Sequence, residues 1–333
     1  MNTFFSIDEN RVKWIDIAKG ISIVFVIIGH TIPHGEFRNF IFSFHMPLFF
    51  ILSGFTFRAP SNIKSIPKRI TKNSKSLLWP SILASIITVL GYWTQGGGYS
   101  FDKFLGLAIK MVDAWWWASG VNVNNHSGLG ALWFLITLFW IRAIVDIITV
   151  LVKPKYQWIV FVLLTIIGIG LGKHKLWLPQ NMDVTFVALI FFYVGILWKK
   201  FEALISKYSI WILLISFLLW AFCLYKGIFI ELAIRHYPRN IISILEAIGA
   251  AYIVCTTCKY IERIKYVGTI FTFIGMHTLI IFIVHHLDRF SSFYWKSSSV
   301  IMTNISRVFI VLGISLVVYL GQEFYNRLRK KCI

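Results

Sequence analysis

The chain has 333 residues, of which 57% are hydrophobic and 14% charged, and its formal net charge is +19. Soluble globular domains carry about 25% charged residues, so this composition excludes an ordinary soluble protein and indicates one that crosses a membrane several times. A charge this positive suggests a nucleic-acid partner only in a soluble protein, so here its distribution has to be compared with the membrane topology first.

Apolar runs long enough to cross a bilayer follow one another along the chain. A spanning helix needs about 20 predominantly apolar residues, and such runs cover residues 14–33, 39–57, 77–94, 131–152, 157–172, 181–198, 209–226, 239–258, 267–287 and 300–322. A polar stretch rather than a signal peptide precedes the first run, so we expect that run to stay in the membrane. The predicted fold class is all-α, a polytopic membrane protein with ten transmembrane helices in a single membrane-embedded domain, residues 1–333, without a separate soluble domain.

Basic residues are concentrated in the loops on one side of the predicted membrane. The loop between the second and third spans has no acidic residue and contains Arg58, Lys64, Lys68, Arg69, Lys72 and Lys75. Since Lys and Arg are enriched in cytoplasmic loops, we predict that both termini are cytoplasmic. We also expect a multi-pass protein of a plasma membrane, of bacterial type. Orientation and contact with anionic lipids account for most of the charge, so the predicted partners of the basic loops are membrane lipids and not nucleic acid.

Two segments carry expectations about local structure. Residues 95–130 form the longest loop, and their apolar side chains with the Trp115–Trp117 triplet suit an amphipathic segment at the outer interface. Pro47 lacks a backbone N–H, so we expect it to bend the second span beside His45.

Ionisable side chains inside the predicted spans are costly and usually mark a site. Lys19 and His30 are eleven residues apart in the first span, which is about three helical turns and roughly 16 Å of rise. One helix therefore presents a cation near the inner surface and an imidazole near the outer surface. A simpler interpretation stays open for two pairs, because Asp16 with Lys19 and Arg142 with Asp146 are spaced for ion pairs within one helix.

Several titratable groups share the outer part of the predicted membrane. Counting along each helix places His30 near the outer end of the first span, and His45 about 9 Å inside that of the second. By the same count Glu246 and Arg307 lie about 10 Å inside their outer ends, and His285 closes the ninth span on that side. We interpret His30 and His45, on consecutive helices, as candidate catalytic residues.

The chemistry that these groups suit is proton abstraction from an alcohol. The pKa of an unperturbed histidine is about 6.5, which matches a general base at neutral pH. The sequence has no GxSxG elbow, HExxH motif or glycine-rich phosphate loop. This favours direct transfer, although an acyl-histidine intermediate stays open. A buried donor such as Arg307 or His45 would stabilise an oxyanion, and the sequence does not choose between them.

The same segments resemble the integral-membrane acyltransferase family 3, in particular its fucose 4-O-acetylase-like branch. The resemblance covers nearly the whole chain, and its matching segments are WIDIAKGISIVFVIIGH, FIFSFHMPLFFILSGF, PKRITK, ALWFL, VALIFFYVGILWKK and FIGMHTLIIFIVHH. It implies ten spans, an acyl donor such as acetyl-CoA taken from the cytoplasm, and an acceptor hydroxyl at or beyond the outer face.

The resemblance also implies roles for individual residues. His30 corresponds to the family's catalytic histidine, and Lys19 to the basic residue paired with it. Arg69 with Lys72 looks like the family's Arg-x-x-Arg motif, with a lysine in second place that lacks the fork of an arginine. Since coenzyme A is anionic at its nucleotide end, we expect its phosphates to be bound by Lys19, Lys68, Arg69 and Lys72.

The predicted function is therefore that of an O-acyltransferase. It would move an acetyl group from acetyl-CoA, without a metal, to a hydroxyl of a cell-surface polysaccharide or lipid-linked glycan, with Glu246, His285 and Arg307 in the substrate pocket. The alternative is a transporter of a small polar substrate such as serine, because the resemblance includes membrane domains fused to racemases. No repeat between the halves, which many transporters show, is evident in the sequence.

Overall fold

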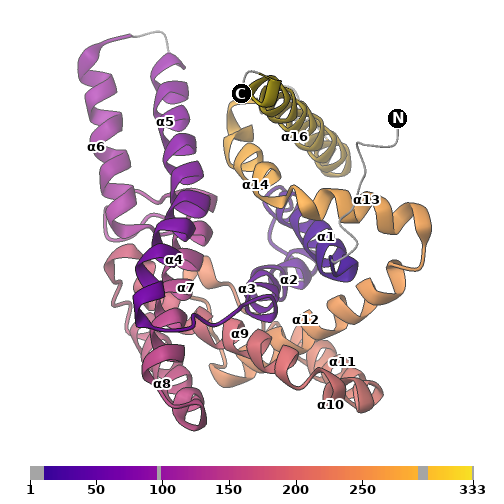
Figure 1. The fold of residues 1–333 in the computed structure, drawn as a ribbon. Helices are drawn as coiled ribbons and strands as arrows, with labels where there is room; N and C mark the ends of the chain where they lie inside the picture. The colour runs from indigo at the N-terminus through magenta and orange to yellow at the C-terminus, as the bar shows by residue number, and fades with distance from the viewer. Residues whose placement is uncertain (1–10, 96–98, 292–298, 332–333) are drawn as a thin grey trace. The chain divides into compact units, whose positions relative to one another are not determined.

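The structure is a computed structural model that describes residues 11–95, 99–291 and 299–331. Helices dominate it, and within these ranges the only strand-like pairings are two isolated bridges, Val123 with His126 and Glu231 with His236 (Figure 1). The helices are α1 Lys13–Gly29, α2 Glu36–Phe42, α3 His45–Phe55, α4 Ile66–Asn73, α5 Trp79–Thr94, α6 Phe101–Trp117, α7 Trp133–Leu151, α8 Pro154–Lys173, α9 Met182–Lys200, α10 Glu202–Lys207, α11 Ser209–Tyr225, α12 Ile241–Ile261, α13 Lys265–Met276, α14 Thr278–Leu287 and α16 Val300–Lys331. The expectation of an all-α protein is confirmed.

Six helical stretches in the described ranges are long and apolar enough to cross a membrane. They are Ile63–Thr94, Gly130–Leu151, Pro154–Lys173, Pro179–Lys200, Ile241–Ile261 and Val300–Arg329, and the bent pair α13 and α14 raises the number to seven if it is one span. Each of the ten predicted apolar runs coincides with helix, but α1 and α11 have only 17 residues. Ten spans and the orientation of the termini therefore stay predictions.

The second predicted span is broken rather than bent. α2 ends at Phe42 and α3 begins at His45, because Phe44 leaves helical geometry with φ −131° and ψ −30°. Pro47 thus lies in the first turn of a new helix, where its missing N–H would have no partner in any case. The expected proline bend beside His45 is wrong for this reason.

The ninth predicted span is bent by 68° between α13 and α14. His277 occupies the break, with φ −105° and ψ 17°, and its Nδ1 lies 2.7 Å from the carbonyl oxygen of Phe273. The imidazole therefore occupies a backbone acceptor that the interrupted helix leaves unpaired.

The contacts of the chain concentrate in two compact units, one of residues 1–41 and 252–333 and the other of residues 42–251. In the second unit α9 is the central helix, because α3, α7 and α8 all pack on it. α3 and α9 approach closely through two glycines. A methyl group added to Gly54 would lie 1.9 Å from the carbonyl oxygen of Phe192, and one added to Gly195 would lie 2.0 Å from that of Ile51. Small residues permit this backbone approach, which is a common basis of helix association in membranes.

The first unit is built in the same way around α1 and α13, which pack against each other. A methyl group at Gly20 would lie 2.3 Å from the carbonyl oxygen of Phe271, and one at Gly275 would meet that of Asp16 at 1.7 Å. α14 and α16 lie side by side in this unit (Figure 1) and both contact α1. Segments from the last part of the chain therefore pack on α1.

Residues 95–130 do not form a simple loop, because α6 folds alongside α5 (Figure 1). Trp115 donates a hydrogen bond of 2.9 Å to the hydroxyl of Ser85 and so joins the two helices. One face of α6 exposes Leu105, Ile109, Val112 and Trp116. The predicted amphipathic character of this segment and its place at the outer interface both stay predictions.

A buried ion pair fastens the connecting segments at the start of α9. Arg235 lies in the left-handed region at φ 58°, and its Nε donates to Asp183 at 2.7 Å. Its guanidinium also donates to Asn181 and Ser119 and stacks over Trp177 at 3.7 Å. Asp183 lies in the first turn of α9, where the helix dipole favours a negative charge. Three separate segments, at residues 119, 177–183 and 235, are thereby held together by one side chain.

Candidate functional site

The first candidate site lies in the unit of residues 1–41 and 252–333, at the C-terminal end of α1. His30 caps α1 with φ −80° and ψ −5°, and its side chain is exposed. The ring of His285, from α14, lies beside it, with 5.3 Å between the two centroids and 32° between the planes. This separation is in the range of packed aromatic rings. The structure therefore brings together two histidines that are 255 positions apart in the sequence.

His285 is held by a carboxylate that the sequence analysis did not single out. Its Nδ1 lies 3.1 Å from Oδ2 of Asp288, and both side chains are buried. A carboxylate only accepts hydrogen bonds, so the Nδ1 facing it carries the proton and Nε2 keeps its lone pair. The Nη2 of Arg307 is farther from Nδ1, at 3.4 Å, than the carboxylate is. The ring is thus fixed in one orientation and one tautomer.

Arg307 of α16 completes this group by neutralising Asp288. Its Nε and Nη2 donate to the two carboxylate oxygens at 2.6 and 2.9 Å. Its Nη1 donates to the hydroxyl of Thr31 at 2.6 Å and to the carbonyl oxygen of Ile27 at 3.3 Å. A cation near a helix C-terminus is favourable because the unpaired carbonyls there carry a partial negative charge. Arg307 therefore links α16 to the end of α1 that carries His30.

At the opposite end of α1, Lys19 lies 3.7 Å from Asp16, so the pairing within the helix is confirmed. The same carboxylate accepts two hydrogen bonds from Arg11, at 2.9 and 3.1 Å. Asp16 is buried, and these two cations offset its charge. Whether Lys19 also binds an acyl donor stays a prediction.

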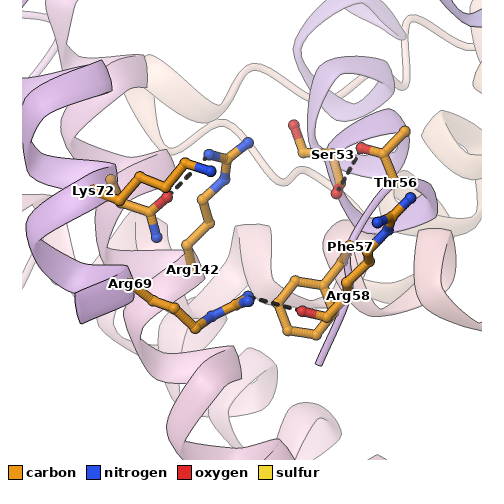
Figure 2. A pocket seen from close by; sticks show the side chains of 8 residues that line it. Ser53, Thr56, Phe57, Arg58, Arg69, Lys72 and Arg142 are labelled. Carbon is orange, nitrogen blue, oxygen red and sulfur yellow. Dashed lines mark hydrogen bonds between the residues drawn. The ribbon is translucent and has the colours of Figure 1, made fainter. Parts of the chain in front are cut away.

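The second candidate site is a cavity of about 260 Å³ in the unit of residues 42–251 (Figure 2). Four cationic side chains line it, namely Arg58, Arg69, Lys72 and Arg142, together with Ser53, Thr56, Phe57 and Asn73. The two members of the arginine–lysine motif thus face the same cavity. Lys68 is exposed and is not among the lining residues, so its donor role stays a prediction.

The charges of this cavity are not paired as the helical spacing suggested. Asp146 is fully buried and accepts two hydrogen bonds of 2.9 Å from Arg69, which lies 77 positions earlier. Arg142 instead donates to the side-chain oxygen of Asn73 at 3.3 Å. An ion pair between Arg142 and Asp146 is therefore wrong, because α4 supplies a cation that reaches the carboxylate from outside α7.

His45 and Glu246 lie in the unit of residues 42–251 and both are buried. His45 packs its ring edgewise against Phe42, with 4.8 Å between centroids. Ser43 lies beside the carboxyl of Glu246 and accepts a hydrogen bond from Trp220 at 2.9 Å. Because His30 belongs to the other unit, the shared catalytic role of His30 and His45 stays a prediction.

No group of three or more His, Cys, Asp or Glu side chains in the described ranges is arranged to hold a metal ion. The first site offers imidazoles, a carboxylate and a guanidinium, and the second offers cationic groups for an anion.

The fold and the site define the class of the protein, which is a multi-pass helical membrane protein with a histidine site and a cationic cavity. Comparison with known proteins gives the family, because the acyltransferase domain of the Acyl_transf_3 family matches residues 12–321. The chain belongs to this family of membrane acyltransferases.

A curated relative is the nodulation protein NolL of Mesorhizobium japonicum, which is 27% identical over 133 residues. The match covers 34% of this chain and 35% of the relative, so the chain spans about a third of the length of that protein. No solved structure matches the chain.

Sequence reasoning missed three contributors to these sites. Asp288 follows the predicted ninth span and carries no motif, so only its spacing of three from His285 would have indicated it. Thr31 is an ordinary polar residue at a helix end. Arg142 was assigned to Asp146, and nothing in the sequence signals that it faces the cavity with Lys72.

Proposed function

We propose that this acyltransferase moves an acetyl group from cytoplasmic acetyl-CoA to a hydroxyl of a cell-surface polysaccharide or lipid-linked glycan. The observation that carries the proposal is the contact between His30 and His285, backed by the buried pair of Asp288 and Arg307. An exposed imidazole next to a buried, oriented one suits proton transfer at the boundary between solvent and protein.

In the proposed reaction His30 is the general base. It takes the proton of the acceptor hydroxyl as that oxygen attacks the thioester carbonyl of acetyl-CoA. The carbon–sulfur bond then breaks, and the coenzyme A sulfur leaves with the proton that His30 returns. The products are an O-acetyl ester and free coenzyme A, so no further reactant is needed.

His285, Asp288 and Arg307 act in this proposal as positioning residues. The donors of Arg307 are occupied by Asp288, Thr31 and the carbonyl of Ile27. This argues against Arg307 as the oxyanion donor and leaves His45 in that role as part of the proposal. Glu246 keeps its proposed place in the substrate pocket, since it is buried near the start of α3.

The proposed donor site is the cationic cavity, on the side that the basic loop predicts to be cytoplasmic. Arg69 and Lys72 line it, and Lys19 and Lys68 stay in the proposed donor set on the basis of their positive charge alone. The phosphates of coenzyme A would be bound there, because charge-assisted hydrogen bonds to phosphate are among the strong ones.

The test is acetyl transfer from labelled acetyl-CoA to membrane glycan, measured with the folded, purified protein. His30→Ala should lower the rate by about 10²- to 10⁴-fold, the usual contribution of a general base. His34→Ala is the matched control, since His34 is an exposed histidine four residues later, and it should leave the rate unchanged. A His30→Ala variant with the wild-type rate would remove His30 from the mechanism, and substrate flux without acetyl-CoA would favour a transporter.

A further inference from the structure

The two basic residues of the arginine–lysine motif have different surroundings in the cationic cavity. Three of the five N–H donors of Arg69 are used within the protein, because its Nε and Nη2 donate to Asp146 at 2.9 Å and Nη2 also donates to the carbonyl oxygen of Arg58 at 2.8 Å. Its guanidinium also lies over the ring of Phe57, 5.5 Å from the centroid. Arg69 is thus committed to the wall of the cavity.

The buried carboxylate explains that commitment. Asp146 is fully buried, and an unpaired charge in such a place is strongly destabilising. Arg69 neutralises it, so the charge of this arginine is already balanced within the protein.

Three other cations of the cavity have no such partner. Arg58, Lys72 and Arg142 form no ion pair with a carboxylate in the part of the chain that the structure describes. Figure 2 shows Lys72 and Arg142 close together on one side of the cavity and Arg58 on the other side. Like charges repel at such positions, so an anion between them lowers the electrostatic energy.

We infer that the cavity binds a phosphate or diphosphate group through Arg142, Lys72 and Arg58, and that Arg69 is a structural residue. The volume of about 260 Å³ admits a ligand of several heavy atoms, since one water takes about 30 Å³ in the liquid. The fork of Arg142 matches phosphate geometry, and Lys72 adds a point charge. The assignment of this phosphate to coenzyme A rests on the proposed function, whereas the anion site itself does not.

The experiment measures binding of inorganic pyrophosphate and of coenzyme A to the purified protein in a neutral detergent, by calorimetry. Arg142→Gln should weaken pyrophosphate binding at least tenfold. Arg142→Lys, which keeps the charge but loses the fork, should bind pyrophosphate more tightly than Arg142→Gln and more weakly than wild type, and it guards against a folding defect in the first variant. Lys64→Gln is the control, because Lys64 is exposed in the same basic segment and does not line the cavity; it should bind as wild type.

A double variant separates the role of Arg69 from that of Arg142. Arg69→Gln with Asp146→Asn removes both charges of the pair and keeps two amides that can hydrogen-bond, so it should stay folded and bind pyrophosphate within about threefold of wild type. The single Arg69→Gln variant should unfold at a lower temperature, since it leaves Asp146 unpaired. Wild-type affinity in Arg142→Gln, or a loss in the double variant as large as that in Arg142→Gln, would overturn the inference.

The same measurement distinguishes the possible sources of the phosphate. If pyrophosphate binds through Arg142 and coenzyme A does not, the anion site stands and the proposed donor fails. Phosphatidylglycerol nanodiscs that compete with pyrophosphate, when phosphatidylcholine nanodiscs do not, would assign the site to a lipid headgroup. A wild-type protein that binds neither pyrophosphate nor coenzyme A in neutral detergent would overturn the anion site.

Discussion

Replacing Arg307 by leucine should unfold the histidine site, because it removes one half of a buried ion pair. The side chains of Arg307 and Asp288 are 8% and 3% exposed. Two charge-assisted hydrogen bonds to the carboxylate are lost, at about 1.5–3 kcal/mol each. The removal of one partner of a buried pair typically costs about 3–5 kcal/mol, because the other charge is left uncompensated. We therefore expect Arg307→Leu to lower the free energy of unfolding by about 3 kcal/mol or more.

A second change distinguishes stability from function. In the double variant Asp288→Leu/Arg307→Leu no charge is left unpaired, and apolar replacements of buried ion pairs are often neutral or stabilising. Most of the lost stability should therefore return. Acyl transfer should not return, because His285 has lost the carboxylate that fixes its proton on Nδ1.

The assay combines equilibrium unfolding in mixed detergent micelles with acetyl transfer by the same preparations. A double variant that regains both stability and the wild-type rate would show that the Asp288–Arg307 pair is only structural. An Arg307→Leu variant as stable as wild type would contradict the reasoning about burial itself.

Three further predictions concern other parts of the chain. Gly54→Ala should lower the free energy of unfolding in detergent by about 1–3 kcal/mol, since overpacking in a tight contact costs this much. Gly170→Ala in α8 is the control, because an added methyl group meets nothing within 4 Å there. It should be neutral or slightly stabilising in the same unfolding assay. Burial lowers the pKa of His236, and Glu231 opposes this more weakly. The unfolded chain then binds a proton more tightly than the folded one, so stability should be highest above about pH 6.5 and fall as the pH drops below it, with a smaller fall in His236→Asn. Arg235→Lys should lower the unfolding temperature, because lysine cannot make both hydrogen bonds to Asp183 that the arginine makes at 2.7 and 3.3 Å; an unchanged unfolding temperature would show that this clamp does not limit stability.

The helices could be predicted from the sequence because apolar runs long enough to cross a membrane are easy to recognise. α7, α9 and α12 lie within a few residues of the predicted spans. The breaks within the second and ninth predicted spans could not be predicted in this way. No glycine or proline occupies residues 42–45, where α2 ends and α3 begins. Hydropathy averages over such local changes of backbone direction.

The sequence predicted which residues belong to the candidate site better than it predicted the contacts between them. His30, His285 and Arg307 were recognised as costly groups inside apolar sequence, and the structure places them together. Asp288 and Thr31 connect them through hydrogen bonds. Both lie at helix ends, where polar residues are common and therefore give no signal in the sequence. For Asp146 the nearest candidate partner along the helix was wrong, because the three-dimensional fold supplied a better placed arginine from another element.

The hydrogen bond between Arg307 and Thr31 joins residues 276 positions apart. At a synthesis rate of about 5–20 residues per second, roughly 14–55 s separate the appearance of the two side chains at the ribosome. α1 is therefore made long before α13, α14 and α16, the helices that pack on it. The histidine site can assemble only after the last part of the chain has been inserted, so each polypeptide gains its proposed catalytic centre at the end of its biogenesis.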